Sequence, residues 1–140
     1  MKVILDTNFL IYCAKEKLDY EEKLISLLNE DYELVVPLQV IEELEMVSKK
    51  KKEKIPLGRR KPKYKKTTGK DKAAAELALQ ILEKKRIRKV DIEGKNVDMA
   101  IIKLAEENKK NIVCTLDKEM RKKLGRVILI SKGNKLMLTR

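Results

Sequence analysis

The chain has 140 residues and a formal net charge of +12, with 40% charged and 43% hydrophobic residues. This length suits one compact domain over residues 1–140, and the apolar fraction is sufficient for a core, which argues against wholesale disorder. The sequence contains no histidine, which excludes Ser-His-Asp and Cys-His catalysis and zinc sites with His ligands. Catalysis would therefore rest on carboxylates, hydroxyls, amines or a hard metal ion.

The two cysteines, Cys13 and Cys114, are too few and too far apart for a Cys-rich zinc site or a disulfide framework. We interpret them as reduced and buried. No stretch approaches the roughly 20 apolar residues that span a bilayer, and residues 1–10 have no small-residue cleavage site. We therefore expect a cytoplasmic protein with no membrane segment and no signal peptide.

The first half of the chain predicts strands that alternate with helices. The run Val3-Ile4-Leu5 ends at Asp6, as is typical of a buried first strand, and Thr7 or Asn8 could then cap a helix. The expected elements are a strand over 2–5, a helix from 7 through 11, a helix over 21–29, a strand over 34–36, and a helix over 38–48 that begins near Pro37.

The second half continues the alternation. The expected elements are a helix over 73–85, a weak strand over 88–92, a helix over 96–108, a buried strand over 111–115, a short helix over 117–124, a strand over 126–131 and an edge strand over 134–139. Continuous apolar strands that alternate with helices predict an α/β fold with a mainly parallel sheet covered on both faces.

The positive charge is concentrated in residues 48–72, which also hold two of the three prolines. This stretch is predicted to be an exposed loop inserted in the domain, and the surplus favours polyanionic partners such as nucleic acid. The alternative is a solvated surface of the kind common in thermophiles. The residues expected to contact phosphates are Lys49, Lys50, Lys51, Lys52, Arg59, Arg60, Lys61, Lys63, Lys65 and Lys66.

Four acids are candidates for one site. Asp6 and Asp117 follow predicted strands, and ligands of open parallel sheets bind at the carboxyl ends of the strands. On a helical projection Asp98 falls inside the apolar arc of its helix, where an uncompensated charge costs about 2 kcal/mol or more. Glu43 lies at the edge of its helix's arc, and Glu42 points further away. Acids that converge would repel one another, and Mg²⁺ or Mn²⁺ would compensate that repulsion and support phosphodiester hydrolysis without histidine.

Each acid also has a structural interpretation. Asp6 and Asp117 could cap the helices that follow them, and Glu43 could be a surface glutamate. The argument for a site is therefore the joint arrangement of the four acids.

Four segments resemble PIN-domain ribonucleases, in the family's order and over nearly the whole chain. They are VILDTNFLI (3–11), VVPLQVIEELE (35–45), NVDMAIIKLA (96–105) and IVCTLDKEMR (112–121). Within the family the chain looks most like archaeal PIN proteins related to small-subunit rRNA-processing nucleases, with VapC-type toxins as broader relatives.

The resemblance implies a Rossmann-like three-layer α/β/α sandwich and Mg²⁺- or Mn²⁺-dependent cleavage of single-stranded RNA. It implies that Asp6, Asp98 and Asp117 hold the metal and that Glu43 completes the catalytic acids. Thr7, Asn8 and Thr115 are similar to the family's small polar residues that orient the carboxylates or the metal's water. A homodimer is also implied.

The sequence departs from the family pattern at two positions. Met99 stands where many relatives carry a second acid, and Leu116 where many carry Asn. Two alternatives to a processing endoribonuclease therefore remain: a non-catalytic RNA-binding module that assembles with ribosomal partners, and a toxin ribonuclease held by an antitoxin.

Overall fold

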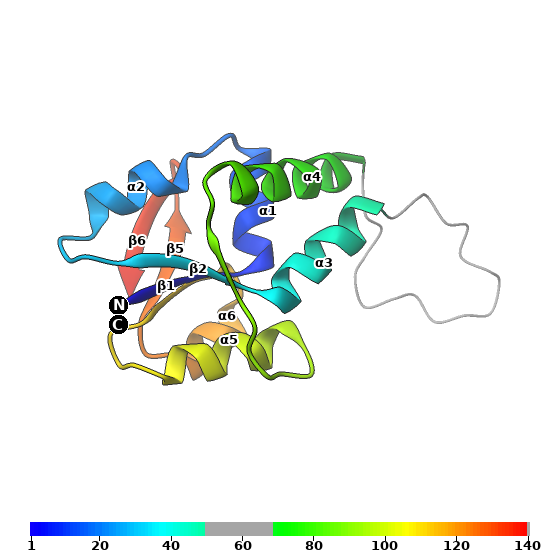
Figure 1. The fold of residues 1–140 in the computed structure, drawn as a ribbon. Helices are drawn as coiled ribbons and strands as arrows, with labels where there is room; N and C mark the ends of the chain where they lie inside the picture. The colour runs from blue at the N-terminus through cyan, green and yellow to red at the C-terminus, as the bar shows by residue number, and fades with distance from the viewer. Residues whose placement is uncertain (50–68, 140) are drawn as a thin grey trace.

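The computed structural model describes residues 1–49 and 69–139, and within these ranges a six-stranded sheet forms the centre in the order β3-β2-β1-β4-β5-β6 (Figure 1). The first five strands along the chain pair in parallel, and β6 pairs antiparallel with β5. The strands are β1 (Lys2–Leu5), β2 (Glu33–Pro37), β3 (Arg88–Val90), β4 (Ile112–Cys114), β5 (Val127–Ser131) and β6 (Lys135–Thr139).

Helices cover both faces of this sheet. In Figure 1, α1, α2 and α4 lie above it, α5 and α6 lie below it, and α3 extends from the end of β2. The helices are α1 (Thr7–Lys15), α2 (Tyr20–Leu27), α3 (Leu38–Lys49), α4 (Gly69–Lys84), α5 (Val97–Glu106) and α6 (Lys118–Lys123). This confirms the predicted α/β fold with a mainly parallel sheet.

The central strands are buried because their side chains are apolar on both faces. Val3, Ile4 and Leu5 of β1 are fully buried, as is all of β4. The helices contribute apolar stripes to the same core, such as Ala100, Ile101 and Leu104 of α5, which packs on β1, β2 and β4. The apolar side chains of α5 and those of the strands therefore pack together and hold α5 against the sheet.

The strand order places a topological switch point beside β1. The connection after β1 leads to β2 on one side, whereas β4 pairs with β1 on the other side. In open parallel sheets the crevice outside the carboxyl ends of such strands is where ligands bind. The residues that follow β1 and β4 are Asp6, a predicted acid, and Thr115, a predicted orienting residue, so the switch point lies at the predicted site.

The predicted elements are all present, with shifts at their ends. Asp6, and neither Thr7 nor Asn8, is the N-cap of α1, because its carboxylate accepts the Thr7 N–H. Pro37 ends β2, and α3 begins at the following residue. The predicted exposed loop over 48–72 is wrong at both ends, since residues 48–49 complete α3 and residues 69–72 begin α4.

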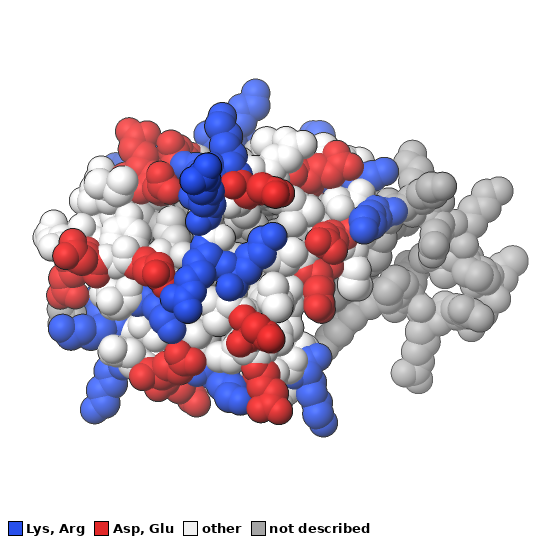
Figure 2. Space-filling view, in the orientation of Figure 1, with Lys and Arg blue, Asp and Glu red and all other residues white. Residues whose placement is uncertain are grey.

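Most of the positive surplus belongs to residues 50–68, whose sequence holds ten Lys and Arg and one Glu. Over the described part of the face in Figure 2, basic and acidic side chains are interspersed. Across residues 1–49 and 69–139 no helix is both long and apolar enough to cross a bilayer.

Candidate functional site

Asp6 lies at the switch point with its side chain almost fully buried, since 4% of the residue is exposed. Its Oδ1 accepts the backbone N–H of Thr7 at 2.8 Å, and its Oδ2 accepts the hydroxyl of Thr115 at 2.6 Å. The backbone N–H of Asp6 donates to the carbonyl of Cys114 at 3.0 Å. Asp6 therefore caps α1 with one oxygen and joins β1 to the end of β4 with the other.

Thr115 links three of the predicted residues. Besides donating to Asp6, its hydroxyl oxygen accepts the backbone N–H of Asp117 at 3.1 Å. The Oδ1 of Asn8 lies 3.4 Å from the same hydroxyl and accepts the backbone N–H of Leu116 at 3.1 Å. Because the hydroxyl has a single proton, the shorter contact directs it to Asp6. Thr115 and Asn8 thus hold the loop after β4 against the start of α1.

The electrostatic state of Asp6 connects it with acids on two helices. The surroundings of Asp6 together raise the pKa of its carboxyl from 3.8 to about 6. Burial is the largest cause, the hydrogen bonds from Thr115 and Thr7 offset part of it, and the charges of Asp98 and Glu43 add smaller increases. The structure therefore brings three of the four predicted acids, from the residue after β1 and from α3 and α5, into one electrostatic neighbourhood.

Glu43 is half-buried on α3, and desolvation raises the pKa of its carboxyl. The hydroxyl of Thr7 faces it closely enough to lower that pKa in part, and the charge of Asp98 raises it. The Thr7 hydroxyl and the Glu43 carboxylate do not form a hydrogen bond. The buried hydroxyl oxygen of Thr7 therefore has no hydrogen-bond partner among the described residues. An unpartnered hydroxyl beside an acid is a suitable contact for a water molecule.

The prediction that Asp98 is buried in the apolar arc of its helix is wrong, because Asp98 is exposed. It lies in the first turn of α5, and burial begins only at Ala100 and Ile101. Ile102 and Ala105, which flank Asp98 on the helical projection, are only partly buried, so Asp98 lies at the exposed edge of the arc. Asp98 therefore pays no burial cost, and its contribution to the site is its charge.

Asp117 is half-buried and is the N-cap of α6, where its carboxylate accepts the N–H of Glu119 at 2.9 Å. The structural interpretation of Asp117 as a cap is thus present in the structure. Its link to Asp6 runs through the Thr115 hydroxyl. The structure places Asp117 on the same loop as Thr115, with one carboxylate oxygen occupied by the cap.

Sequence patterns did not indicate Gln39, which joins two elements of the site. Its side-chain nitrogen donates to the carbonyls of Ile92 and Gly94, in the connection between β3 and α5. The one signal in the sequence is spacing, because Gln39 precedes Glu43 by four residues and shares its helix face.

The chemistry of these residues fits a hard divalent cation. Asp6, Glu43 and Asp98 offer carboxylate oxygens, the donors that Mg²⁺ and Mn²⁺ prefer, and the unpartnered Thr7 hydroxyl can hold a water. Within residues 1–49 and 69–139, however, no three Asp, Glu, Cys or His side chains are grouped closely enough to hold an ion as they stand.

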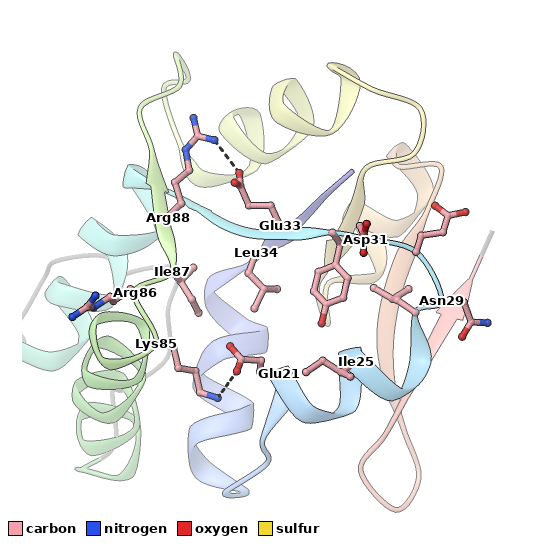
Figure 3. Close-up of a pocket in the computed structure, with 13 residues that line it drawn as sticks. Glu21, Ile25, Asn29, Asp31, Glu33, Leu34, Lys85, Arg86, Ile87 and Arg88 are labelled. Carbon is pink, nitrogen blue, oxygen red and sulfur yellow. Dashed lines mark hydrogen bonds and ion pairs between the residues drawn. The ribbon is translucent and has the colours of Figure 1, made fainter.

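A separate groove of about 640 Å³ lies at the opposite edge of the sheet, where β2 and β3 begin (Figure 3). Ion pairs line it: Arg88 with Glu33 at 2.9 Å and Lys85 with Glu21 at 3.6 Å. Asp6 and Thr115 instead follow the carboxyl ends of their strands. The groove is therefore distinct from the candidate site around Asp6.

Of the residues predicted to contact phosphates, Lys49 is described, as the exposed last residue of α3. The others, Lys50, Lys51, Lys52, Arg59, Arg60, Lys61, Lys63, Lys65 and Lys66, lie outside the described residues.

Comparison with known proteins gives a consistent result. The family model for the PIN domain matches residues 3–124. The chain is 36% identical over 123 residues to Ribonuclease VapC4 of Methanocaldococcus jannaschii. The aligned residues cover 88% of this chain and 82% of that protein.

Two solved structures have a similar fold. The PIN domain endonuclease Utp24 is 22% identical with a TM-score of 0.70, and the match covers 99% of this chain and 91% of that one. VapBC2 from Rickettsia felis, solved bound to a DNA fragment from their promoter, is 19% identical with a TM-score of 0.57, covering 94% of this chain and 100% of that one. At these identities the two structures support the fold alone.

Proposed function

Since the chain belongs to the PIN-domain family, we propose that it is a metal-dependent endoribonuclease that hydrolyses phosphodiester bonds of single-stranded RNA. The observation that carries this proposal is the coupling of Asp6 with Glu43 and Asp98 at the switch point of the sheet. The negative charges of Glu43 and Asp98 oppose ionisation of the buried Asp6, and a divalent cation would offset that repulsion.

Asp6, Asp98 and Asp117 are the residues that would hold the ion. The fixed member is Asp6, whose two oxygens are oriented by Thr7 and Thr115. A bound Mg²⁺ or Mn²⁺ would neutralise negative charge on the phosphodiester and assist formation of the nucleophile. Thr115 and Asn8 keep the loop with Asp117 beside Asp6, so the site's geometry is set by hydrogen bonds outside the ion's own ligands.

Glu43 is the residue suited to placing the attacking water. Its raised pKa makes its carboxylate a better proton acceptor than an exposed glutamate, and the Thr7 hydroxyl beside it can hold the same water. Lys49 lies further along α3, at its last residue, where it can draw the RNA backbone toward the site. The remaining basic residues of 50–66 supply further phosphate contacts in this proposal.

The decisive experiment is cleavage of an end-labelled single-stranded RNA with Mn²⁺, Mg²⁺ or EDTA. We expect cleavage with either metal, none with EDTA, and a loss of about 100-fold or more in Asp6→Asn and Asp98→Asn. Glu42→Gln, at an exposed position one residue before Glu43, is the matched control and should cleave normally. Unchanged cleavage in Asp6→Asn would rule out this site.

A non-catalytic RNA-binding module, for example one that assembles with ribosomal partners, is the second candidate. It is favoured by the absence of a preformed group of three ligands in the described residues and by the exposed Met99 beside Asp98. Salt-sensitive RNA binding without cleavage under any divalent metal would support it.

The biological setting has two candidates: rRNA processing and a toxin–antitoxin pair. The relationship to VapC4 favours the second, whereas the likeness to Utp24 concerns the fold. Growth arrest on expression that a neighbouring gene's product relieves would identify a toxin. We also propose a cytoplasmic homodimer, which light scattering of the purified chain would test.

A further inference from the structure

Gln39, in the first turn of α3, is hydrogen-bonded to the connection that precedes α5. Its Nε2 atom donates to the carbonyl oxygens of Ile92 at 2.6 Å and Gly94 at 3.3 Å. Its Oε1 atom is buried and has no partner among the described residues. The side chain is therefore held through its nitrogen, with both amide hydrogens directed at one backbone segment.

The segment that Gln39 holds determines where α5 begins. A Cβ atom added at Gly94 would lie 2.8 Å from the backbone nitrogen of Ala100, so the connection is pressed directly onto the helix. Two residues later Asn96 caps α5, with its Oδ1 accepting the N–H of Met99 at 2.9 Å and its carbonyl accepting that of Ala100 at 3.1 Å. Displacing the Gln39 contact would therefore displace the first turn of α5.

Each of the two elements that Gln39 joins carries an acid of the candidate site. Glu43 follows Gln39 by four residues and so lies one turn further along the same face of α3. Asp98 lies in the first turn of α5, which packs against α3. The hydrogen bonds of Gln39 thus span the interface that sets the separation of Glu43 and Asp98.

These two acids repel each other, and the repulsion acts to separate the helices. We propose that Gln39 is a positioning residue that holds the start of α5 against α3, so that Glu43 and Asp98 face the same cation site beside Asp6. This inference rests on the proposed metal-dependent function. It adds a residue that touches neither the metal nor the RNA and that acts through the backbone of residues 92–94.

Two substitutions separate the hydrogen bonds of Gln39 from its bulk. Gln39→Glu is isosteric but replaces the amide donor with an oxygen that faces two carbonyls. Gln39→Met keeps the length and removes the polar group, and it serves as the second variant if Gln39→Glu does not fold. Gln80→Glu makes the same chemical change at an exposed position of α4 and is the matched control.

The experiment measures two quantities on each folded variant. Amide hydrogen exchange at Met99 and Ala100 reports whether the start of α5 is held, and calorimetric titration with Mn²⁺ reports the site. We expect faster exchange at both amides and Mn²⁺ affinity weakened about 10- to 100-fold in the Gln39 variants, as for residues that orient metal ligands. RNA cleavage should fall by a similar factor at limiting Mn²⁺ and by less at saturating Mn²⁺. Gln80→Glu should match the wild type throughout.

Two outcomes would overturn the positioning role alone. Unchanged exchange at Met99 and Ala100 would show that Gln39 does not hold α5, and faster exchange with wild-type Mn²⁺ affinity would show a purely structural contact. A wild-type chain that neither binds Mn²⁺ nor cleaves RNA would instead overturn the proposed function, and this inference with it.

Discussion

The hydroxyl of Thr115 donates a 2.6 Å hydrogen bond to the Oδ2 atom of Asp6, joining the loop after β4 to the end of β1 across the switch point of the sheet. Both residues are buried, at 0% and 4% exposure. A hydrogen bond from a neutral donor favours the ionised carboxylate, so Thr115 counteracts part of the burial that raises the Asp6 pKa. The contact therefore controls both the charge and the orientation of Asp6.

Replacing Thr115 with valine should raise the Asp6 pKa above its present value of about 6, because the donor is lost and the burial stays. We expect a stability loss of about 1.5–3 kcal/mol at pH 7, as for other hydrogen bonds to charged groups. Thr115→Ser keeps the hydroxyl and should preserve the pKa. Carboxyl carbon NMR during a pH titration checks this, and a valine variant with an unshifted Asp6 would contradict it.

Asp6→Asn should stabilise the fold at neutral pH. A carboxyl whose folded pKa is raised favours folding only while protonated, so the wild type loses stability as pH rises from about 4 to about 6. The shift corresponds to about 3 kcal/mol at pH 7. Urea unfolding should therefore show the asparagine variant close to wild type at pH 4 and more stable at pH 7. Asp91→Asn, at an exposed position, is the control, and a gain equal at both pH values would refute the argument.

The strands and most helices could be predicted because each depends on local pattern. Continuous apolar runs such as Val3 to Leu5 predict buried parallel strands, and the fold expected from the PIN resemblance is confirmed. Asp98 shows where pattern fails. A helical projection gives the direction of a residue but not how much of the apolar arc its neighbours cover, and Ile102 and Ala105 on either side of Asp98 are only partly buried.

Gln39 shows a second limit of pattern. Its partners are backbone carbonyls 53 and 55 residues away. Every residue has a backbone carbonyl, so the sequence does not indicate which carbonyls a side chain will bind. Asp6 as the cap of α1 was an alternative that the sequence raised but could not choose, because Asp6, Thr7 and Asn8 are all good capping residues. In the structure Asp6 caps α1 with Oδ1, and its Oδ2 accepts the hydroxyl of Thr115, a partner distant in sequence.

Neutralising Glu43 or Asp98 should move the Asp6 pKa in the direction opposite to Thr115→Val. Both acids raise that pKa through their charge, so Glu43→Gln and Asp98→Asn should each lower it. Glu42→Gln removes a charge at an exposed position and should leave it unchanged. The same NMR titration reads all three variants. An Asp6 pKa that stays unchanged or rises on neutralising either acid would show that this acid does not share the site of Asp6.

Asp117 can be tested for its two roles separately. Asp117→Ala removes the cap of α6 and should cost about 1 kcal/mol of stability, whereas Asp117→Asn keeps a capping oxygen for the Glu119 N–H. If Asp117 holds the metal, the asparagine variant should keep its stability and lose Mn²⁺ affinity and RNA cleavage. Wild-type cleavage by Asp117→Asn would leave Asp117 with the cap alone.

Gly94 should not tolerate even a methyl group. The added Cβ would lie 2.8 and 2.9 Å from the backbone nitrogen and Cα of Ala100, and backbone atoms cannot move aside as the end of a flexible side chain does. We expect Gly94→Ala to cost about 1–3 kcal/mol of unfolding free energy, as overpacking does elsewhere. It should also weaken Mn²⁺ binding, because Asp98 lies in the helix turn that would be displaced.

Gly125→Ala is the matched control for this substitution, since no atom of the described residues lies within 4 Å of a Cβ atom at that position. Urea unfolding and Mn²⁺ titration of the two variants side by side distinguish a local clash from a general effect of replacing glycine. If Gly94→Ala is as stable as Gly125→Ala, the connection before α5 yields to the methyl group. In that case residues 92–94 are not a rigid connection, and the hydrogen bonds from Gln39 of α3 would not fix the position of Asp98 on α5.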